Sequence, residues 1–448
     1  MALLTKNSIN SEYTNHSGDN KNVYLSFAAF GSENVWYSTW AMKSRDCMDC
    51  SFIADKGERL YFVSDSRTSY KCQYGIFLKD CSSCHYVYDA HGCTNCFMSS
   101  NMRNKSYMFR NEQCTREEYF QKMQEIDLSS FETRETLSEE FEVLMEIGSI
   151  HRYVVSERNA NSIGSLMYDC KNVTDSFETN KCEDSKYIYG GIENRNCADI
   201  YHVGYNVELC YELQGCTRVT NSAFCHLCYD NTFLQYCDSC QNSQNLFGCV
   251  SIKKGEYMIL NKKYSKEEYT YLRARIIEQM KSTGEYGEFF PPNIAPVYYN
   301  ETQGALYMPL SKEETLARGW QWEDNLPGTY GKETVTPENV PDSILEVSDS
   351  ATKEIYRCMT CTKNFNIVPD ELAFYRREII PLPRRCPDCR YKRRFALRPP
   401  RKLWPRTCMC TRTNHEHGDT CPNTFETPFA PERPEQVFCE ACYQQEVI

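Results

Sequence analysis

The sequence lacks the long apolar run that a transmembrane helix requires. No stretch of about 18 apolar residues occurs, and the polar residues 1–20 show no basic start followed by an apolar segment. We therefore expect neither secretion nor a membrane partner, and we expect a cytoplasmic protein. In a reducing compartment, abundant cysteine indicates metal ligands or buried thiols more often than disulfides.

Signatures of catalysis are also scarce. No Gly-rich loop followed by Lys and then Ser or Thr is present, which excludes the common phosphate-binding loop. The carboxylates are scattered through turn-like segments, and no pair of them is recognisable as a general acid and base. The histidines of the repeat region stand alone: His85, His91, His151, His202 and His226. The sequence favours a non-enzymatic protein, with a carbohydrate-active solenoid enzyme as the weaker alternative by analogy of fold.

Cysteine, in contrast, is abundant, with 27 residues in a chain of 448. A chain of this length can bury an adequate apolar core and needs no disulfide staples, and an odd number of cysteines fits poorly with complete pairing. The length suggests two to four domains. The abundance of cysteine must therefore be explained in another way, and the spacing of the cysteines indicates how.

Two segments of the chain look like copies of each other. The first contains Cys81-Ser-Ser-Cys84 and Cys93-Thr-Asn-Cys96, and the second contains Cys225-His-Leu-Cys228 and Cys237-Asp-Ser-Cys240. The phrases Thr-Arg-Glu-Glu-Tyr119 and Ser-Lys-Glu-Glu-Tyr269 follow in the same order. A displacement of about 144 to 150 residues relates the two segments, which indicates an internal duplication.

A finer period of twelve residues lies within each copy. Cys225, Cys237 and Cys249 are twelve residues apart, as are Cys81 and Cys93, and looser members are Cys170, Cys182, Cys197 and Cys216. Asn, Asp, Gly and Ser alternate with Tyr, Phe, Val and Ile, without a helical period. This pattern predicts a mainly β fold, with a duplicated short-repeat parallel β-solenoid whose narrow interior accepts small side chains.

Each copy ends in a predicted helix that caps the solenoid. Thr115 and Ser265 are followed by Glu-Glu-Tyr, as expected of an N-cap and first-turn acidic residues. Covering the last coil prevents strand addition by another chain. We divide the chain accordingly: flexible N-terminus 1–20, first repeat half 21–128, second repeat half 129–282, irregular connector 283–352, and tandem zinc ribbons 353–400 and 401–448.

The first ribbon, residues 353–400, contains two Cys-x-x-Cys pairs. Cys358-Met-Thr-Cys361 and Cys386-Pro-Asp-Cys389 are separated by a stretch long enough for a strand pair. Two such pairs supply four thiolates to one tetrahedral Zn²⁺. The alternative is two unrelated thiol pairs in a core.

The second ribbon, residues 401–448, offers seven candidate ligands. We choose Cys408, Cys421, Cys439 and Cys442, and interpret Met409 to Thr420 as a loop inserted into the first pair. Cys410, His415 and His417 either contribute a ligand, hold a second metal or are merely solvated. The sequence thus predicts two zinc sites. In the repeats, we interpret the cysteines as buried thiols, with further metal at Cys81, Cys84, Cys93 and Cys96 or their counterparts, or thiol redox chemistry, as alternatives.

Three phrases carry a resemblance to a known family. They are Tyr257-Met-Ile-Leu-Asn-Lys-Lys-Tyr-Ser-Lys-Glu-Glu-Tyr269, Gly287-Glu-Phe-Phe-Pro291, and the segment from Phe425 to Tyr443. From about residue 20 onward, the chain resembles a family of uncharacterised cysteine-rich zinc-ribbon proteins from ultra-small, candidate-phylum bacteria. The resemblance implies a cytoplasmic zinc-ribbon protein without an established activity. The inserted loop with Cys410 departs from the simpler Cys-x-x-Cys form of the family.

Charge is unevenly distributed along the chain. The net charge is −11, but Arg376 to Arg406 contains twelve Lys or Arg residues against two acidic ones, which leaves −21 for the remainder. Cations that alternate with aromatic residues are typical of single-strand nucleic-acid binding. The candidate phosphate contacts are Arg390, Lys392, Arg393, Arg394, Arg398, Arg401 and Arg406, and the candidate stacking residues are Tyr391, Phe395 and Trp404.

These features predict a zinc-binding scaffold whose basic tail contacts RNA or another nucleic acid. One alternative is that the basic segment docks on the acidic remainder of the chain itself. A second is a protein–protein adaptor in which the zinc ribbons are purely structural and the basic patch meets an acidic partner surface.

Overall fold

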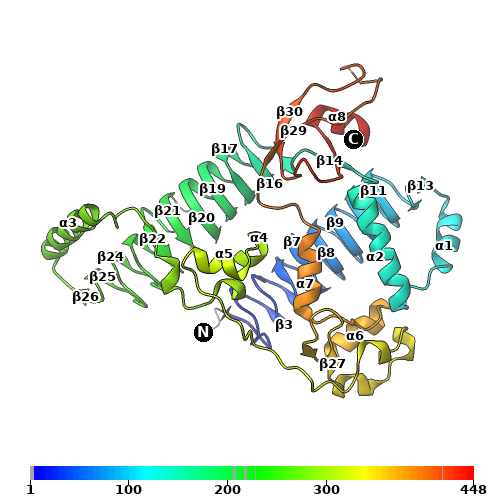
Figure 1. Cartoon of the computed structure of the whole chain (residues 1–448), viewed down its shortest axis with the longest axis horizontal. Helices are drawn as coiled ribbons and strands as arrows, with labels where there is room; N and C mark the ends of the chain where they lie inside the picture. Colours follow the sequence, from blue (N-terminus) through cyan, green and yellow to red (C-terminus); the bar gives the residue numbers. More distant parts are fainter. Residues whose placement is uncertain (1–4, 205–207, 216–218, 228, 416) are drawn as a thin grey trace.

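The computed structural model describes residues 5–204, 208–215, 219–227, 229–415 and 417–448. The chain is mainly β, with 35% strand and 23% helix, and it contains a β-solenoid of about 20 turns. The predicted fold class is therefore confirmed. Figure 1 shows the coils as two arms, one blue and one green, with the orange and red C-terminal tail packed beside them.

The first arm is a stack of parallel strands. Lys21 pairs with Glu33, and Glu33 pairs with Arg45, so each coil advances twelve residues. The N-terminus that we expected to be flexible belongs to this stack from Thr5, which pairs with Ser17. The strands are β1 (Thr5–Lys6), β2 (Ser17–Gly18), β3 (Lys21–Tyr24), β4 (Glu33–Trp36), β5 (Thr39–Ala41), β6 (Arg45–Met48), β7 (Ser51–Ala54), β8 (Tyr61–Arg67), β9 (Gln73–Lys79), β10 (His85–His91), β11 (Phe97–Arg103) and β12 (Met108–Phe109), closed by the antiparallel β13 (Glu112–Gln113).

The second arm repeats this construction. It ends in the hairpin of β25 and β26, just as the first arm ends in β12 and β13, which agrees with the predicted duplication. Its strands are β15 (Ser156–Glu157), β16 (Gly164–Tyr168), β17 (Lys171–Thr174), β18 (Ser176–Asn180), β19 (Glu183–Ile192), β20 (Arg195–Gly204), β21 (Glu208–Gln214), β22 (Ala223–His226), β23 (Thr232–Gln235), β24 (Gln244–Phe247), β25 (Glu256–Ile259) and β26 (Lys262–Lys263). The strand β14 (Ile150–Arg152) lies outside the arm and pairs with the tail.

The corners of the coil explain its abundance of Asn and Asp. A backbone with positive φ recurs at about every third residue, as at Asp46, Asp49 and Phe52. Asn and Asp tolerate this left-handed conformation better than other non-glycine residues. In successive coils their side chains also form a ladder: the Asn22 Nδ2 donates to Asn34 Oδ1 at 3.0 Å, and Asn34 Nδ2 donates to Asp46 Oδ1 at 3.0 Å.

The interior of both arms combines small side chains, including the cysteines, with larger aliphatic ones such as Leu78 and Leu234, so it is wider than the sequence suggested. Cys81 and Cys93 are at most 1% exposed, and the Cys81 Sγ donates to the Ala90 carbonyl of the next coil at 3.2 Å. Free cysteine packs well in such a setting, as a small and weakly polar side chain. Cys216 and Cys228, and the side chain of His202, lie outside the described residues.

The two predicted helices close the arms, and another helix, between them in the sequence, was not predicted. The helices α1 (Arg116–Gln124) and α3 (Lys266–Thr283) begin with capping boxes at Thr115 and Ser265. The helix α2 (Phe131–Glu146) begins the segment assigned to the second repeat half, yet it packs on β10 and β11 of the first arm. No helix in the described ranges has the length and apolar character needed to cross a bilayer.

The connector and the tail contain short elements. The connector is irregular, with η1 (Pro292–Ile294), η2 (Tyr299–Glu301), α4 (Gly304–Tyr307), α5 (Lys312–Ala317), η3 (Pro337–Asn339), η4 (Ile344–Glu346) and η5 (Asp349–Lys353). The tail contains β27 (Tyr356–Arg357), β28 (Asn364–Phe365), α6 (Pro369–Glu378), α7 (Pro387–Ala396), β29 (Trp404–Thr407), β30 (Thr424–Thr427), β31 (Gln436–Phe438) and α8 (Glu440–Val447).

Candidate metal centres and the cleft between the arms

The first module, residues 353–400, brings together the four predicted thiols. The sulfur atoms of Cys358, Cys361, Cys386 and Cys389 all lie within 4.8 Å of one another. The Cys361 and Cys386 sulfurs are 3.7 Å apart, far beyond the roughly 2.05 Å of a disulfide. This group can hold a metal ion.

The second module, residues 401–448, brings together the four thiols chosen from its seven candidates. The sulfurs of Cys408, Cys421, Cys439 and Cys442 also lie within 4.8 Å of one another, with 3.8 Å between those of Cys421 and Cys439. Cys410, His415 and His417 form a third group, in which Cys442 is the fourth member.

Backbone hydrogen bonds show that the two modules are built alike. The Cys358 sulfur accepts from the Cys386 N–H at 3.2 Å, and the Cys408 sulfur accepts from the Cys439 N–H at 3.2 Å. The N–H of Cys358 donates to the Lys363 carbonyl, two residues after Cys361. The N–H of Cys408 donates to Asn423, two residues after Cys421. Cys421 therefore occupies the position of Cys361, which supports the interpretation of Met409 to Thr420 as an inserted loop.

The second cysteine pair of each module begins a helix. Cys386 is the N-cap of α7, with Pro387 in the first turn, and Cys439 is the N-cap of α8. A helix N-terminus favours the thiolate over the thiol. The stretch between the pairs of the first module differs from our expectation of a strand pair: it contains the two-residue β28 and the helix α6.

The metal-binding groups of the described residues lie outside the repeats. All three groups in the described part of the chain belong to the tail. The cysteines described in the arms are packed as solenoid interior instead, and their sulfurs donate to backbone carbonyls, as at Cys84 to Cys93 O at 3.6 Å.

The arginines predicted to contact phosphates are largely buried against carboxylates of the chain itself. Arg394 Nη1 lies 3.1 Å from Asp49 Oδ1, and Arg390 Nε lies 2.9 Å from Asp49 Oδ2. The Asp49 side chain is fully buried and those of Arg390 and Arg394 are at most 5% exposed. In this arrangement neither arginine is accessible to a phosphate. Both join α7 to the first arm.

Arg398 and Arg401 connect the tail to both arms at once. Arg398 donates to Asp65 of the first arm at 2.6 and 2.9 Å, and to Glu178 of the second arm at 2.7 Å. Arg401 also pairs with Glu178. The Arg398 side chain is 2% exposed and that of Arg401 is 10% exposed, so both serve as internal clamps rather than as a phosphate-binding surface. We call the group formed by Asp65, Glu178, Arg398 and Arg401 the clamp.

The other predicted nucleic-acid residues are divided between the interior and the surface. Arg393 pairs with Glu135 and Glu142 of α2. Tyr391 donates to Gln303 at 3.1 Å, and Phe395 lies edge-on to Tyr307, so the connector covers both rings. Arg406 donates to the carbonyls of Ala430 and Glu435. Of the ten residues predicted to bind nucleic acid, Lys392 alone is exposed. Trp404 is half-buried and lies beside the exposed Lys402.

The charge state of Glu178 gives a pH test of the clamp. Burial raises the pKa of Glu178, but the guanidinium groups of Arg398 and Arg401 more than offset this effect and lower it to about 2. A carboxyl with a lowered folded-state pKa stabilises the fold fully above its unfolded value of about 4.5, and this contribution is lost as the pH falls toward 2. We expect Glu178→Gln to cost about 2 kcal/mol, equally at pH 8 and at pH 5.5.

Urea unfolding at the two pH values measures this cost. Glu183→Gln is the matched control, because Glu183 lies on the same arm and pairs with two exposed side chains, Lys171 at 2.9 Å and Arg195 at 3.9 Å. A cost for Glu178→Gln that shrinks markedly at pH 5.5 would show that the pKa of the carboxyl lies above its ordinary range, not below it, and that the clamp is weak.

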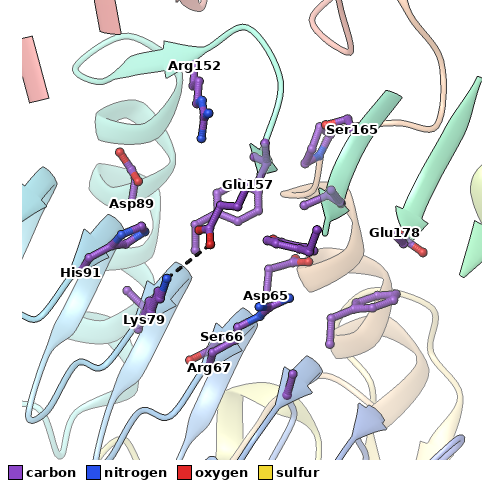
Figure 2. A pocket seen from close by; sticks show the side chains of 18 of the residues that line it. Asp65, Ser66, Arg67, Lys79, Asp89, His91, Arg152, Glu157, Ser165 and Glu178 are labelled. Atoms are coloured by element: carbon purple, nitrogen blue, oxygen red, sulfur yellow. Dashed lines mark hydrogen bonds and ion pairs between the residues drawn. The ribbon is translucent and has the colours of Figure 1, made fainter. Parts of the chain in front are cut away.

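A cleft of about 210 Å³ lies where the two arms and the second module meet (Figure 2). Its walls carry both charges and aromatic rings. The Lys79 Nζ of the first arm is 3.3 Å from Glu157 Oε2 of the second, and the guanidinium of Arg67 stacks on the Tyr168 ring at 3.9 Å. The second module adds Tyr443, which contacts Asp89 and Arg103.

Arg67 is a cation of the cleft that has no carboxylate partner among the described residues. No carboxylate in the described ranges lies within ion-pair distance of Arg67, whereas Lys79, Arg103 and Arg152 are each paired. His91 also lines the cleft, and burial lowers its pKa. The cleft can therefore accept an anionic group at Arg67, next to apolar walls such as Phe52 and Phe77.

Sequence reasoning missed the cleft and the carboxylate partners of the tail. Asp49, Asp65 and Glu178 occupy left-handed corners of the coil, a conformation that already explains the two aspartates locally. Their pairing with residues more than 200 positions away leaves no local signal. No known protein-family model matches the chain, and no curated protein matches it at a significant level.

Proposed function

We propose that the protein is a non-enzymatic zinc-binding scaffold, in which two structural zinc modules hold the two solenoid arms together. The observation that carries this proposal is the position of Arg398, which contacts Asp65 of one arm and Glu178 of the other. Arg398 lies at the end of the first module in the sequence, and the second module begins three residues later, at Arg401. Zinc would fold both modules and so keep the clamp in place.

The donor sets suit zinc. Thiolates favour soft metals, and four of them are typical of structural Zn²⁺. A Zn–S bond of about 2.3 Å in a tetrahedron gives sulfur–sulfur edges of about 3.8 Å. The observed distances of 3.7 Å and 3.8 Å match this edge. Four thiolates leave no open position for a substrate, so these sites support structure rather than catalysis.

The cleft is the recognition surface that this scaffold would present. Arg67 offers an unpaired cation beside aromatic walls, which suits an acidic segment of a partner protein that also carries an aromatic residue. The buried arginines favour this adaptor function over RNA binding by the tail, because they already neutralise carboxylates of the chain.

Two binding measurements on the full chain test the proposal. A fluorescein-labelled Glu-Phe-Glu-Phe-Glu peptide should bind, and Arg67→Gln should weaken its binding about tenfold, as loss of a charged hydrogen bond does. Arg45→Gln is the matched control, because Arg45 lies on the same arm, outside the cleft lining, with a 58% exposed side chain. Equal affinity for wild type and Arg67→Gln would refute recognition at the cleft.

Labelled single-stranded RNA provides the second measurement. The log–log salt slope should be no steeper than about −1.4, because each phosphate contact adds about −0.7. Of the four exposed cations in the described basic segment, Arg376 and Arg377 pair with carboxylates of the chain itself, which leaves Lys392 and Lys402 for phosphates. Lys392→Ala with Lys402→Ala should abolish this weak binding. A slope several times steeper would favour RNA binding by the tail over the adaptor function.

A further inference from the structure

The second module has more metal-binding side chains than one tetrahedral ion can use. Besides Cys408, Cys421, Cys439 and Cys442, it holds Cys410, His415 and His417. The ligand atoms of these last three residues and of Cys442 lie within 4.8 Å of one another. Cys442 is thus a member of two four-residue groups.

Within the described residues, three of the four ring nitrogens of the two histidines lack the hydrogen bonds that buried imidazoles normally have. Both ring nitrogens of His417 are buried without a hydrogen-bond partner in the described part of the chain. Unpaired buried polar atoms are costly and uncommon in native proteins. His415 is 6% exposed, and its Nδ1 lies 3.2 Å from the Cys410 sulfur. A metal ion among these side chains would take one ring nitrogen of each histidine and the Cys410 sulfur.

The donor count points to two ions. Two tetrahedral ions need eight ligand positions, and seven side chains fill eight positions when one thiolate bridges. Cys442 is the residue common to both groups. We propose that the second module binds two zinc ions that share the Cys442 thiolate, one completed by Cys408, Cys421 and Cys439, and the other by Cys410, His415 and His417. This inference rests on the zinc site proposed above for the second module.

The surroundings of His415 complete the second site. The Nε2 of His415 is 3.1 Å from Glu446 Oε1, whose other oxygen is 3.2 Å from Arg412 Nε. With Nδ1 on the metal, Nε2 keeps its proton and lies beside the Glu446 carboxylate. A carboxylate behind a histidine ligand fixes the tautomer and the ring orientation. Binding of the second ion displaces the Cys410 thiol proton, and Glu446 acts as a positioning residue.

The loop inserted into the second module accounts for its three additional ligands. In the first module, which has no insertion, Cys361 is exposed and Cys389 is only half-buried. In the second module, both equivalents, Cys421 and Cys442, are buried. Residues 409–420 therefore add three ligands and also cover the first ion.

Metal counting on the full chain is the first test. Native mass spectrometry of protein purified without chelator should show three zinc ions per chain. Cys410→Ser should hold two, and so should Cys361→Ser, whereas His91→Gln, a control in the cleft, should keep three. Two ions in the wild type would refute the second ion of this module and leave the proposed function standing. No ion or one ion would refute both.

Bridging is tested on protein reconstituted with ¹¹³Cd²⁺. Two cadmium ions that share a thiolate should show scalar coupling to each other, while the cadmium of the first module should show none. Cys361→Ser should preserve the coupled pair, and Cys410→Ser should remove the coupling while leaving the two four-thiolate signals. Glu446→Gln should lower the affinity of the second ion about 10- to 100-fold and spare the other two. Three uncoupled signals in the wild type would overturn the shared thiolate.

Discussion

Cys358→Ser is expected to abolish zinc binding by the first module and to unfold residues 353–400 while the arms remain folded. Structural zinc contributes on the order of 10–16 kcal/mol in small modules, more than the short β27 and β28 hairpin can replace. Loss of the module also removes Arg390 and Arg394 from Asp49. Hydrogen exchange followed by mass spectrometry should show rapid exchange in the tail peptides and unchanged protection in β8 to β11.

The matched control is Cys93→Ser, which alters an equally buried cysteine that belongs to no metal-binding group. Serine fills comparable interior positions elsewhere in the coil, as at Ser38 and Ser44. This variant should retain the full zinc content and a protected tail. Protection of residues 353–400 in zinc-free Cys358→Ser would show that the module folds on packing alone.

Asp49→Asn is expected to destabilise the protein by about 3–5 kcal/mol, because it leaves two buried guanidinium groups without their shared charge. Asp49 is fully buried between Arg390 and Arg394, and only Arg390 keeps another carboxylate, that of Glu371 at 3.5 Å. Urea unfolding of the full chain, followed by tyrosine and tryptophan fluorescence, measures the loss.

Asp55→Asn controls for the backbone in this experiment. Asp55 has the same left-handed conformation as Asp49, with φ of 56° against 53°, but its side chain is exposed. Asparagine tolerates this conformation as aspartate does, so the control should change stability by less than about 0.5 kcal/mol. Equal effects of the two substitutions would mean that the buried ion pairs contribute nothing to docking of the tail.

Much of the fold was predictable because its information is local and repeated. The twelve-residue cysteine period indicates the coil. Thr115 and Ser265, each followed by an acidic first turn, indicate the capping helices. The Cys-x-x-Cys pairs likewise indicate the first metal-binding group, because the two cysteines of each pair are close in the sequence. The helix α6 was missed although its signals were present: Pro369 at the start, Asp370 and Glu371 in the first turn, and Arg376 and Arg377 in the last.

The site was less predictable because it depends on contacts between distant segments. A basic and aromatic segment has the same composition whether it faces RNA or carboxylates of its own chain. Only the three-dimensional structure shows that Arg394 meets Asp49, 345 residues away. The cleft likewise combines short pieces of both arms and of the second module, none of which carries a motif.

Small-angle X-ray scattering of the full chain, with and without zinc, tests most directly whether the zinc modules hold the two arms together. The zinc-loaded protein should give the scattering curve calculated from the structure. After chelation under reducing conditions, the radius of gyration and the maximum dimension should both increase, because release of Arg398 frees the arms to separate. Superimposable curves for the two forms, with zinc removal verified by metal analysis, would contradict the account.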